Sequence, residues 1–266
     1  MSTNYRDRIY QHYVSRYLAL STTARYTYNK KFYEDWARVA IGRIKRLLPE
    51  QKDSAICEVA CGHGGLLYGL KQLGYTNMIG IDISSEQVEL AKKIWPNIVQ
   101  GDAIEFLQNH PNSFDLIVAF DFIEHFRKEE IFSILDVFLA ALRPGGRLIL
   151  STPNAESPLP TDCWWDFTHE VCFTSNSMKQ ILQVVGFEKV EILPAEPVPH
   201  GWFSTVRWAL WQILKMLIYF YNLVETSRPG SGVFTRTMIA TALKPLYMET
   251  KSGGGNASGD CAHNAR

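Results

Sequence analysis

The chain has 266 residues, of which 46% are hydrophobic and 20% are charged, a composition typical of soluble globular proteins. This length favours one α/β domain with additions over two separate domains. The 27 basic and 27 acidic residues give a formal net charge of +0. The chain therefore lacks the basic excess of proteins that bind duplex nucleic acid.

The first part of the chain, residues 1–54, is predicted to form an N-terminal helical cap. Apolar side chains from Trp36 to Leu48 recur every three or four residues, and Pro49 ends this pattern. Residues 1–16 are polar and lack the apolar core of a signal peptide. The five cysteines include no C-x-x-C pair, so we expect free, structural cysteines and a reducing, cytoplasmic location.

The pattern changes at residue 55, where short apolar runs begin to alternate with helical patterns. This alternation predicts βα units and a mainly parallel sheet. Ser84 and Gln87 have the spacing of a capping box, and Gly186 is suited to end a helix over 176–185. The expected strands cover residues 55–60, 77–82, 98–100, 114–120, 147–151, 190–193 and 237–243.

A glycine-rich turn follows the first expected strand. Gly62 and Gly64 have no Cβ, so they allow the backbone to approach a ligand closely. In open α/β sheets this is where ligands bind, outside the carboxyl ends of the strands. Such a turn alone also fits NAD or FAD proteins, although this one lacks the G-x-G-x-x-G spacing of a dehydrogenase.

Acidic residues at three further strand ends add to this signal. Asp82 ends the second strand, about 20 residues past the glycines, where a carboxylate can accept ribose hydroxyls. Asp102 follows the third strand, where a carboxylate can accept an adenine amino group, and Asp121 follows the fourth. Each acid alone is equally suited to a loop or a helix cap, so the ordered set carries the prediction of a cofactor site.

This ordered set resembles the class I S-adenosylmethionine-dependent methyltransferases. The resemblance implies a methyltransferase with S-adenosyl-L-methionine as cofactor and a catalytic domain over 55–248. It also implies an α/β fold: a Rossmann-like, seven-stranded, mostly parallel sheet flanked by helices, with N-terminal helices and an amphipathic helical insertion before the last strand. By position, the implied cofactor-binding residues are Glu58, Ala60, Cys61, Gly62, Gly64, Asp82, Ile83, Asp102, Ala103 and Phe120.

The resemblance also implies individual roles and contains one departure. Glu58 orients the loop near the methionine amino group, and Phe120 lies beside the methionine moiety. Ala60 stands where the family's E-x-G-x-G-x-G loop has its first glycine. Because alanine tolerates φ above zero poorly, we expect Ala60 to lie outside the left-handed region, with the cofactor site retained.

Two clusters are candidates for the acceptor side. Asp121, Glu124 and His125 follow the fourth strand, and His169 lies in a segment after the fifth. Either histidine could be the general base for a hydroxyl acceptor. The alternatives are that His125 caps the following helix and that His169 satisfies buried backbone.

Metal binding is a further alternative at the first cluster. The spacing of Asp121, Glu124 and His125 is similar to the E-x-x-E-H cluster of ubiquinone-pathway O-methyltransferases, which implies a divalent ion. Our prediction contains no metal. Loss of activity with a chelator, restored by Mg²⁺, would favour the alternative.

The acceptor is read from a looser resemblance. The segment 166–170 is similar to methyltransferases of bacterial cell-envelope polysaccharide pathways, which implies O-methylation of a sugar hydroxyl on a glycan. Trp164 and Trp165 are then candidates to stack on sugar rings. The alternatives are a small aromatic or quinone-like acceptor, or a scaffold that binds the cofactor without turnover. The N/D-P-P-Y/F segment of base-flipping DNA methyltransferases is missing, so we expect no nucleic-acid partner.

The insertion over 202–224 is apolar and long enough to span a bilayer. Lys215 lies in its middle, and Arg207 and Gln212 share one arc with it, which indicates an amphipathic helix rather than a transmembrane span. Three readings stay open: packing on the domain or a homodimer partner, peripheral contact with the inner face of the membrane, or a lid. Residues 249–266 are expected to form a disordered tail.

Overall fold

Seven strands form one sheet in the computed structural model of the chain, which describes residues 5–10 and 29–247. Their order is β3-β2-β1-β4-β5-β7-β6, and β7 alone runs antiparallel to its neighbours. The expected Rossmann-like fold class is therefore confirmed. The strands are β1 (Ile56–Val59), β2 (Met78–Asp82), β3 (Ile98–Gln100), β4 (Phe114–Phe120), β5 (Leu142–Pro153), β6 (Glu188–Pro194) and β7 (Thr237–Leu243).

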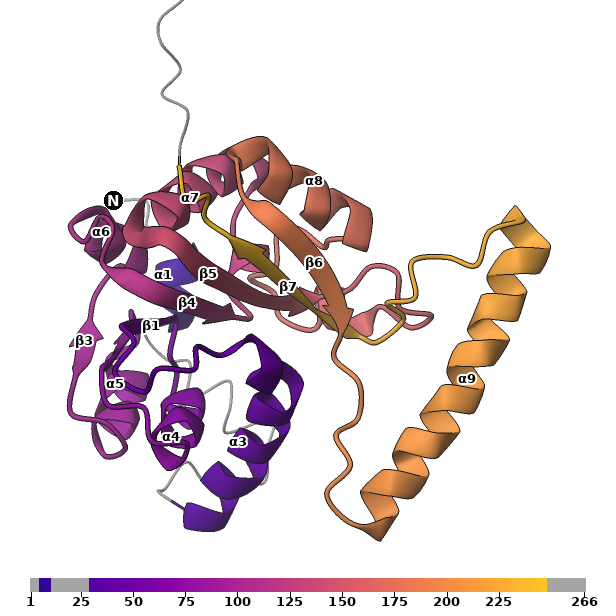
Figure 1. Ribbon diagram of the computed structural model, residues 1–266, viewed down its shortest axis with the longest axis horizontal. Coiled ribbons are helices and arrows are strands. Elements are labelled where there is room, and N and C mark those ends of the chain that lie inside the picture. The colour runs from indigo at the N-terminus through magenta and orange to yellow at the C-terminus, as the bar shows by residue number, and fades with distance from the viewer. Residues whose placement is uncertain (1–4, 11–28, 248–266) are drawn as a thin grey trace, which may run out of the picture.

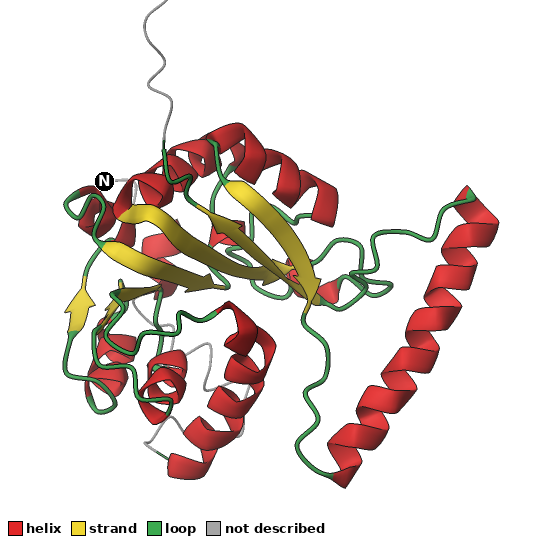
Figure 2. Ribbon diagram, viewed as in Figure 1, coloured by secondary structure: helices red, strands yellow, loops and turns green. Residues whose placement is uncertain are grey.

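Helices cover both faces of this sheet, as Figures 1 and 2 show. Apolar runs such as Leu116–Ala119 are continuous rather than alternating because both faces of these parallel strands are buried. One face is covered by α3 (Lys30–Ile44), α4 (Gly65–Gln72) and α5 (Ser85–Lys92). The other is covered by α6 (Ala103–Gln108), α7 (Lys128–Ala141) and α8 (Ser175–Val185).

The N-terminal helix α3 belongs to the same core as the sheet. The Asn29 side chain caps it by accepting from the backbone N–H groups of Lys31 and Phe32. Its apolar face packs on α4, where a Cβ on Gly69 would lie 2.7 Å from Cγ1 of Ile41. A short 3₁₀ turn, Lys45–Leu47, follows before Pro49. A further helix, α1 (Tyr5–Tyr10), is described; the rest of the expected cap, residues 1–4 and 11–28, lies outside the described residues.

Four strands, β1, β2, β5 and β6, have bounds that differ from the expected ones, and two of these differences have a local cause. β5 begins at Leu142 rather than at residue 147, because the expected turn around Gly145 is a register shift within the strand. Gly145 has φ +77, and Lys244 N donates to Gly146 O at 2.8 Å. β1 ends at Val59 rather than at residue 60, because Ala60 has φ +52 and leaves the extended conformation.

The cysteines do not all follow the expectation. Cys57 and Cys61 are buried and free, as expected of small core residues. Cys163 and Cys172 form a disulfide, so the expectation of free cysteines is wrong for this pair. The chain reverses between them and brings their Cα atoms to 5.5 Å, which a spacing of nine residues does not reveal. The argument for a reducing location that rested on free cysteines therefore fails; Cys261 lies outside the described residues.

The insertion forms α9 (Trp202–Thr226), two residues longer than expected. It stands apart from the sheet and its covering helices, and one linker at each end connects it to β6 and β7 (Figure 1). Within the described residues, no helix is both long enough and apolar enough to cross a membrane. The expected disordered tail, 249–266, lies outside the described residues.

Candidate active site

A cavity of about 350 Å³ opens at the carboxyl ends of β1, β2, β3 and β4. It lies where the strand order reverses between β1 and β4, the position at which open α/β sheets bind ligands. Seven of the ten residues expected to bind cofactor line this cavity. They are Ala60, Gly62, Asp82, Ile83, Asp102, Ala103 and Phe120.

The turn after β1 forms one wall of the cavity. Ala60 has φ +52, so the expectation that it avoids the left-handed region is wrong. The turn holds it there: Cys61 N donates to Ile81 O at 3.0 Å, and Gly62 N donates to Asp82 Oδ2 at 2.8 Å. A Cβ on Gly62 would meet only Oε1 of Gln87, at 4.0 Å. The backbone is thus open to a ligand at this point.

Asp82 is held rigidly by the backbone around it. Its Oδ2 accepts from Gly62 N and its Oδ1 accepts from Ser84 N, both at 2.8 Å. Burial raises the pKa of Asp82, and these two backbone hydrogen bonds oppose the shift because they stabilise the charged form. Each carboxylate oxygen has a second lone pair, so Asp82 can still accept hydrogen bonds from a ligand.

Asp102 combines two functions that the sequence presented as alternatives. It caps α6, because its Oδ1 accepts from Ile104 N at 2.7 Å and from Glu105 N at 3.1 Å. It also lines the cavity. Both capping bonds use Oδ1, which leaves Oδ2 for a ligand.

Three expected cofactor residues do not line the cavity. Glu58 is buried, its Oε2 has no hydrogen-bond partner among the described residues, and burial raises its pKa well above the usual range. Cys61 is buried, with its Sγ close to Gly80. Gly64, with φ +82, precedes α4, and a Cβ there would lie 3.2 Å from Cα of Ala91. These three residues therefore belong to the protein interior that supports the loop and do not line the cavity.

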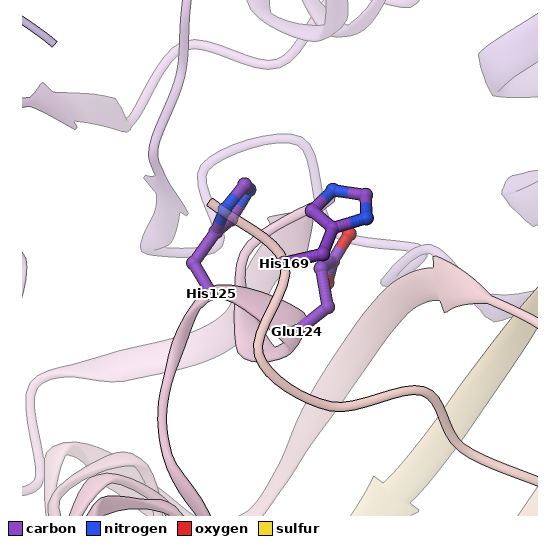
Figure 3. A group of neighbouring side chains, drawn as sticks. All are labelled: Glu124, His125 and His169. Carbon is purple, nitrogen blue, oxygen red and sulfur yellow. The ribbon is translucent and has the colours of Figure 1, made fainter. Parts of the chain in front are cut away.

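The two acceptor-side clusters come together in space. Glu170 N and Val171 N donate to Glu124 O at 2.8 and 3.2 Å, which docks the segment after β5 onto the 3₁₀ turn Ile123–His125. The rings of His125 and His169 lie 4.9 Å apart in an edge-to-face arrangement. Figure 3 shows these two rings with Glu124.

His125 lines the cavity, and both of its ring nitrogens contact protein groups. Nδ1 lies 2.8 Å from Thr168 Oγ1, and Nε2 lies 3.1 Å from Asp121 O. The Thr168 hydroxyl in turn donates to Asp166 Oδ1 at 2.7 Å. Burial, together with the neighbouring His169, lowers the pKa of His125 to about 4, so the ring is neutral at pH 7.

Glu124 is fully buried, and neither of its carboxyl oxygens has a hydrogen-bond partner among the described residues. Burial raises its pKa well above the usual range, and the nearby Asp121 raises it further. His169 lies beside it with Nδ1 3.2 Å from Cys163 O, so the expected alternative of a satisfied backbone carbonyl is present. One ligand atom from each of Glu124, His125 and His169 lies within 4.8 Å of the others.

Asp121 lines the cavity with φ +49. Surrounding protein raises the pKa of its carboxyl by desolvation, and the charges of His169 and Arg43 oppose this shift. Its exposed surface faces the cavity. Asp121 thus adds a carboxyl group to the cavity beside His125, whose Nε2 contacts its backbone oxygen.

Helix α1 contributes cavity residues that the sequence did not indicate. Arg6 and Tyr10 both line the cavity. Arg6 Nη2 lies 3.1 Å from Glu130 Oε2, its guanidinium lies 5.5 Å from the Phe126 ring centroid, and the Tyr10 ring is edge-to-face with His125 at 6.1 Å. No local motif marks these residues, because their role depends on contacts with chain more than 100 residues away.

The expected sugar-stacking pair is placed elsewhere. Trp164 and Trp165 are 72% and 70% exposed and do not line the cavity. The aromatic side chains that line it are Tyr10, Phe120 at the end of β4, and Phe122 and Phe126 after this strand.

Comparisons with known proteins agree with this geometry. A family model described as "Methyltransferase domain" matches residues 30–192. The chain is 26% identical over 195 residues to the ubiquinone biosynthesis O-methyltransferase of Klebsiella pneumoniae subsp. pneumoniae, covering 71% of this chain and 75% of that protein. A crystal structure of a SAM dependent methyltransferase from Archaeoglobus fulgidus is similar with a TM-score of 0.59 at 22% identity, covering 82% of this chain and 100% of that one; this similarity supports the fold.

A further relative bears on the acceptor. The chain is 27% identical over 156 residues to the tRNA U34 carboxymethyltransferase of Helicobacter pylori, covering 53% of this chain and 59% of that protein. This similarity speaks against the expected exclusion of nucleic acid, which rested on net charge and on a missing DNA-methyltransferase segment; neither criterion tests for an RNA acceptor. Neither curated relative supports the expected polysaccharide similarity.

Proposed function

Because the chain belongs to the methyltransferase family whose model it matches, we propose that it transfers the methyl group of S-adenosylmethionine to a hydroxyl of a small aromatic, quinone-like acceptor. The observation that carries this proposal is one continuous cavity. Asp82 and Asp102 stand at its cofactor side, and Asp121 and His125 stand at its acceptor side.

The residues of the cavity fit the proposed cofactor. Its volume of about 350 Å³ lies within the range of small-molecule sites. Asp82 and Asp102 offer carboxylate oxygens to ribose and adenine, and the backbone of Ala60 and Gly62 lines the same space. The cofactor, when bound, supplies a sulfonium methyl that is electrophilic without further activation. The protein's task is then to align the acceptor and remove its proton.

His125 is the proposed general base, and its neighbours determine its tautomer. The carboxylate of Asp166 can only accept, so the single hydroxyl proton of Thr168 goes to Asp166. Thr168 Oγ1 therefore accepts from Nδ1–H of His125, which leaves Nε2 to take the acceptor's proton. Asp121 O lies 3.1 Å from Nε2 and can only accept, so the acceptor's hydroxyl must displace this contact to reach the lone pair of Nε2. The arrangement follows the logic of a base oriented by a third group.

The acceptor class is supported by the cavity lining as well as by the quinone-pathway relative. Phe120, Phe122 and Phe126 line the cavity beside His125, and apolar rings favour a planar aromatic acceptor. Trp164 and Trp165, the expected stacking partners of a sugar ring, lie outside the cavity. A quinone-like phenol is therefore preferred over the sugar hydroxyl expected from the sequence.

A divalent ion is the alternative way to activate the acceptor. Glu124, His125 and His169 are suitable donors by type. The oxygens of Glu124 are buried and have no hydrogen-bond partner in the part of the chain that the structure describes, which fits a nearby cation. These three residues would hold the ion, which would lower the pKa of an acceptor hydroxyl by acting as a Lewis acid. Like the acceptor's hydroxyl, an ion at Nε2 of His125 would have to displace the contact of this atom with Asp121 O.

The proposal is tested by a methyl-release assay with S-adenosylmethionine and separate acceptor classes. Catechols and hydroxylated quinone precursors form the first class, nucleotide sugars and glycan extracts the second, and tRNA the third. We expect turnover with the first class only. Turnover confined to sugars or to tRNA would show that the proposed acceptor class is wrong. Cofactor binding without turnover on any acceptor would favour a scaffold.

A further inference from the structure

Helix α9 carries a wide apolar face that nothing in the described chain covers. We call this apolar face the outer face of α9. The residues along its central line, or spine, are Trp202, Val206, Ile213, Leu217, Phe220 and Val224. Their side chains are between 41% and 69% exposed. At about 100° per residue, about twelve residues of the helix fall within an arc of about 160° around this spine, and none of them is charged.

The opposite side of α9 faces its own linkers. Lys215 Nζ donates to Glu196 Oε1 at 2.7 Å, and Gln212 Nε2 donates to Glu196 Oε2 at 3.3 Å. Tyr219 packs edge-to-face on Phe234 with ring centroids 5.1 Å apart. Gln212 and Lys215 thus contact the linker before the helix, Tyr219 contacts the linker after it, and the outer face points away from both. Figure 1 shows the helix standing clear of the domain.

We propose that the outer face of α9 lies in the interface of a phospholipid bilayer and holds the enzyme at a membrane surface. The width of this face favours a lipid surface over a second copy of the chain as its partner. One partner helix covers a seam of about two residues in seven, which is about seven of the 25 residues of α9. Roughly five apolar side chains of the outer face would stay in water, whereas a bilayer interface covers the whole arc at once.

Charge determines how this contact depends on lipid composition. Lys215 is paired with Glu196, and Arg207 is the other basic residue of α9. Glu225 also lies on α9, so its charge and that of Arg207, together with the Lys215–Glu196 pair, sum to zero. The helix thus lacks the basic polar face by which many interfacial helices recognise anionic lipid. Apolar burial must supply the binding, so neutral vesicles should bind nearly as well as anionic ones.

The test is vesicle flotation with the full chain. Phosphatidylcholine vesicles are compared with vesicles that also contain phosphatidylglycerol, for the wild type and for Ile213→Glu combined with Leu217→Glu. Both changes lie in the centre of the outer face and touch no core residue. The matched control is Phe132→Glu with Val184→Glu, which places the same charges at exposed apolar positions of α7 and α8.

The wild type and the control should float with both vesicle types, with affinities within about twofold of each other, and the α9 variant should lose more than about tenfold. No flotation of the wild type, or equal flotation of the α9 variant, would overturn the proposal. Light scattering tests the alternative of a second copy. If the wild type is a dimer and the variant with Ile213→Glu and Leu217→Glu is a monomer, the outer face binds a second copy instead. Methyl transfer to a water-soluble acceptor should be unchanged in all variants, so the outcome is independent of the proposed reaction.

Discussion

Thr168 Oγ1 lies 2.8 Å from Nδ1 of His125, although 43 residues separate the two in the chain. Thr168 is fully buried and also bonds to Asp166 through its hydroxyl and its backbone N–H. This contact fixes the ring of a histidine that faces the cavity. It is the relationship on which the proposed proton transfer depends.

Thr168→Ala removes the hydroxyl and leaves the tautomer of His125 undefined. We expect kcat to fall by about tenfold or more, which is part of the 10²–10⁴-fold contribution of a general base, while the KM for S-adenosylmethionine stays unchanged. Thr168→Ser keeps the hydroxyl and should restore most of the activity. Steady-state kinetics on the three proteins checks this. An equal loss in the serine variant would indicate that Thr168 acts only through packing.

The pH dependence of kcat/KM follows from the pKa of His125. The base works only when neutral, and burial lowers its pKa to about 4. The active form is therefore present above pH 4 and is lost as the pH falls through 4, whereas an ordinary histidine would lose it near pH 6.5. We expect the acidic limb of the profile near pH 4, with circular dichroism as a control for unfolding. A limb near 6.5 would contradict the assignment of His125 as the buried base.

The fold and one side of the site were predictable because their signals are local. Asp82 is the last residue of β2 and Asp102 comes two residues after β3, and the ends of parallel strands meet at one edge of the sheet. A short strand–turn–helix pattern therefore places both carboxylates without any knowledge of tertiary structure. The sequence presents a helix cap and a cofactor ligand as alternatives for Asp102, whereas in the structure Asp102 both caps α6 and lines the cavity.

The acceptor side was less predictable because it depends on contacts between distant segments. His169 joins Glu124 and His125 only because the backbone after Asp166 docks on Glu124 O. Helix α1 reaches the cavity through Arg6, whose partner Glu130 lies 124 residues away. The left-handed Ala60 is a further case: residue preference argued against it, and the hydrogen bonds of the turn override that preference.

Ala60→Gly tests how much strain this turn contains. An alanine in the left-handed region costs about 1–2 kcal/mol, and the greater freedom of glycine in the unfolded chain offsets about 0.4–1 kcal/mol of that. We expect the free energy of unfolding to rise by up to about 1 kcal/mol, with cofactor affinity retained. Ala60→Val should lower it, since a β-branched side chain tolerates this φ least. Chemical denaturation measures both; a clear loss of stability in the glycine variant would contradict the strain.

Treatment with a chelator distinguishes His125 as the general base from activation of the acceptor by a divalent ion. With His125 as the base, dialysis against a chelator should leave the methyl-transfer rate within about twofold of the untreated enzyme, because no residue role depends on an ion. A chelator that removes activity, with recovery on addition of Mg²⁺ or Zn²⁺, would assign Glu124, His125 and His169 to a metal site. Elemental analysis of the purified protein serves as the control.

The central claim is that the cavity around Asp82 binds the methyl donor. Isothermal titration of S-adenosylmethionine into the wild type, Asp82→Asn and the surface control Asp136→Asn tests it most directly. The account predicts binding by the wild type and the control. It predicts roughly fivefold weaker binding by Asp82→Asn, because hydrogen bonds to a charged acceptor are worth about 1 kcal/mol more than neutral ones. Equal affinity in a folded Asp82→Asn protein, or no binding by the wild type, would contradict it.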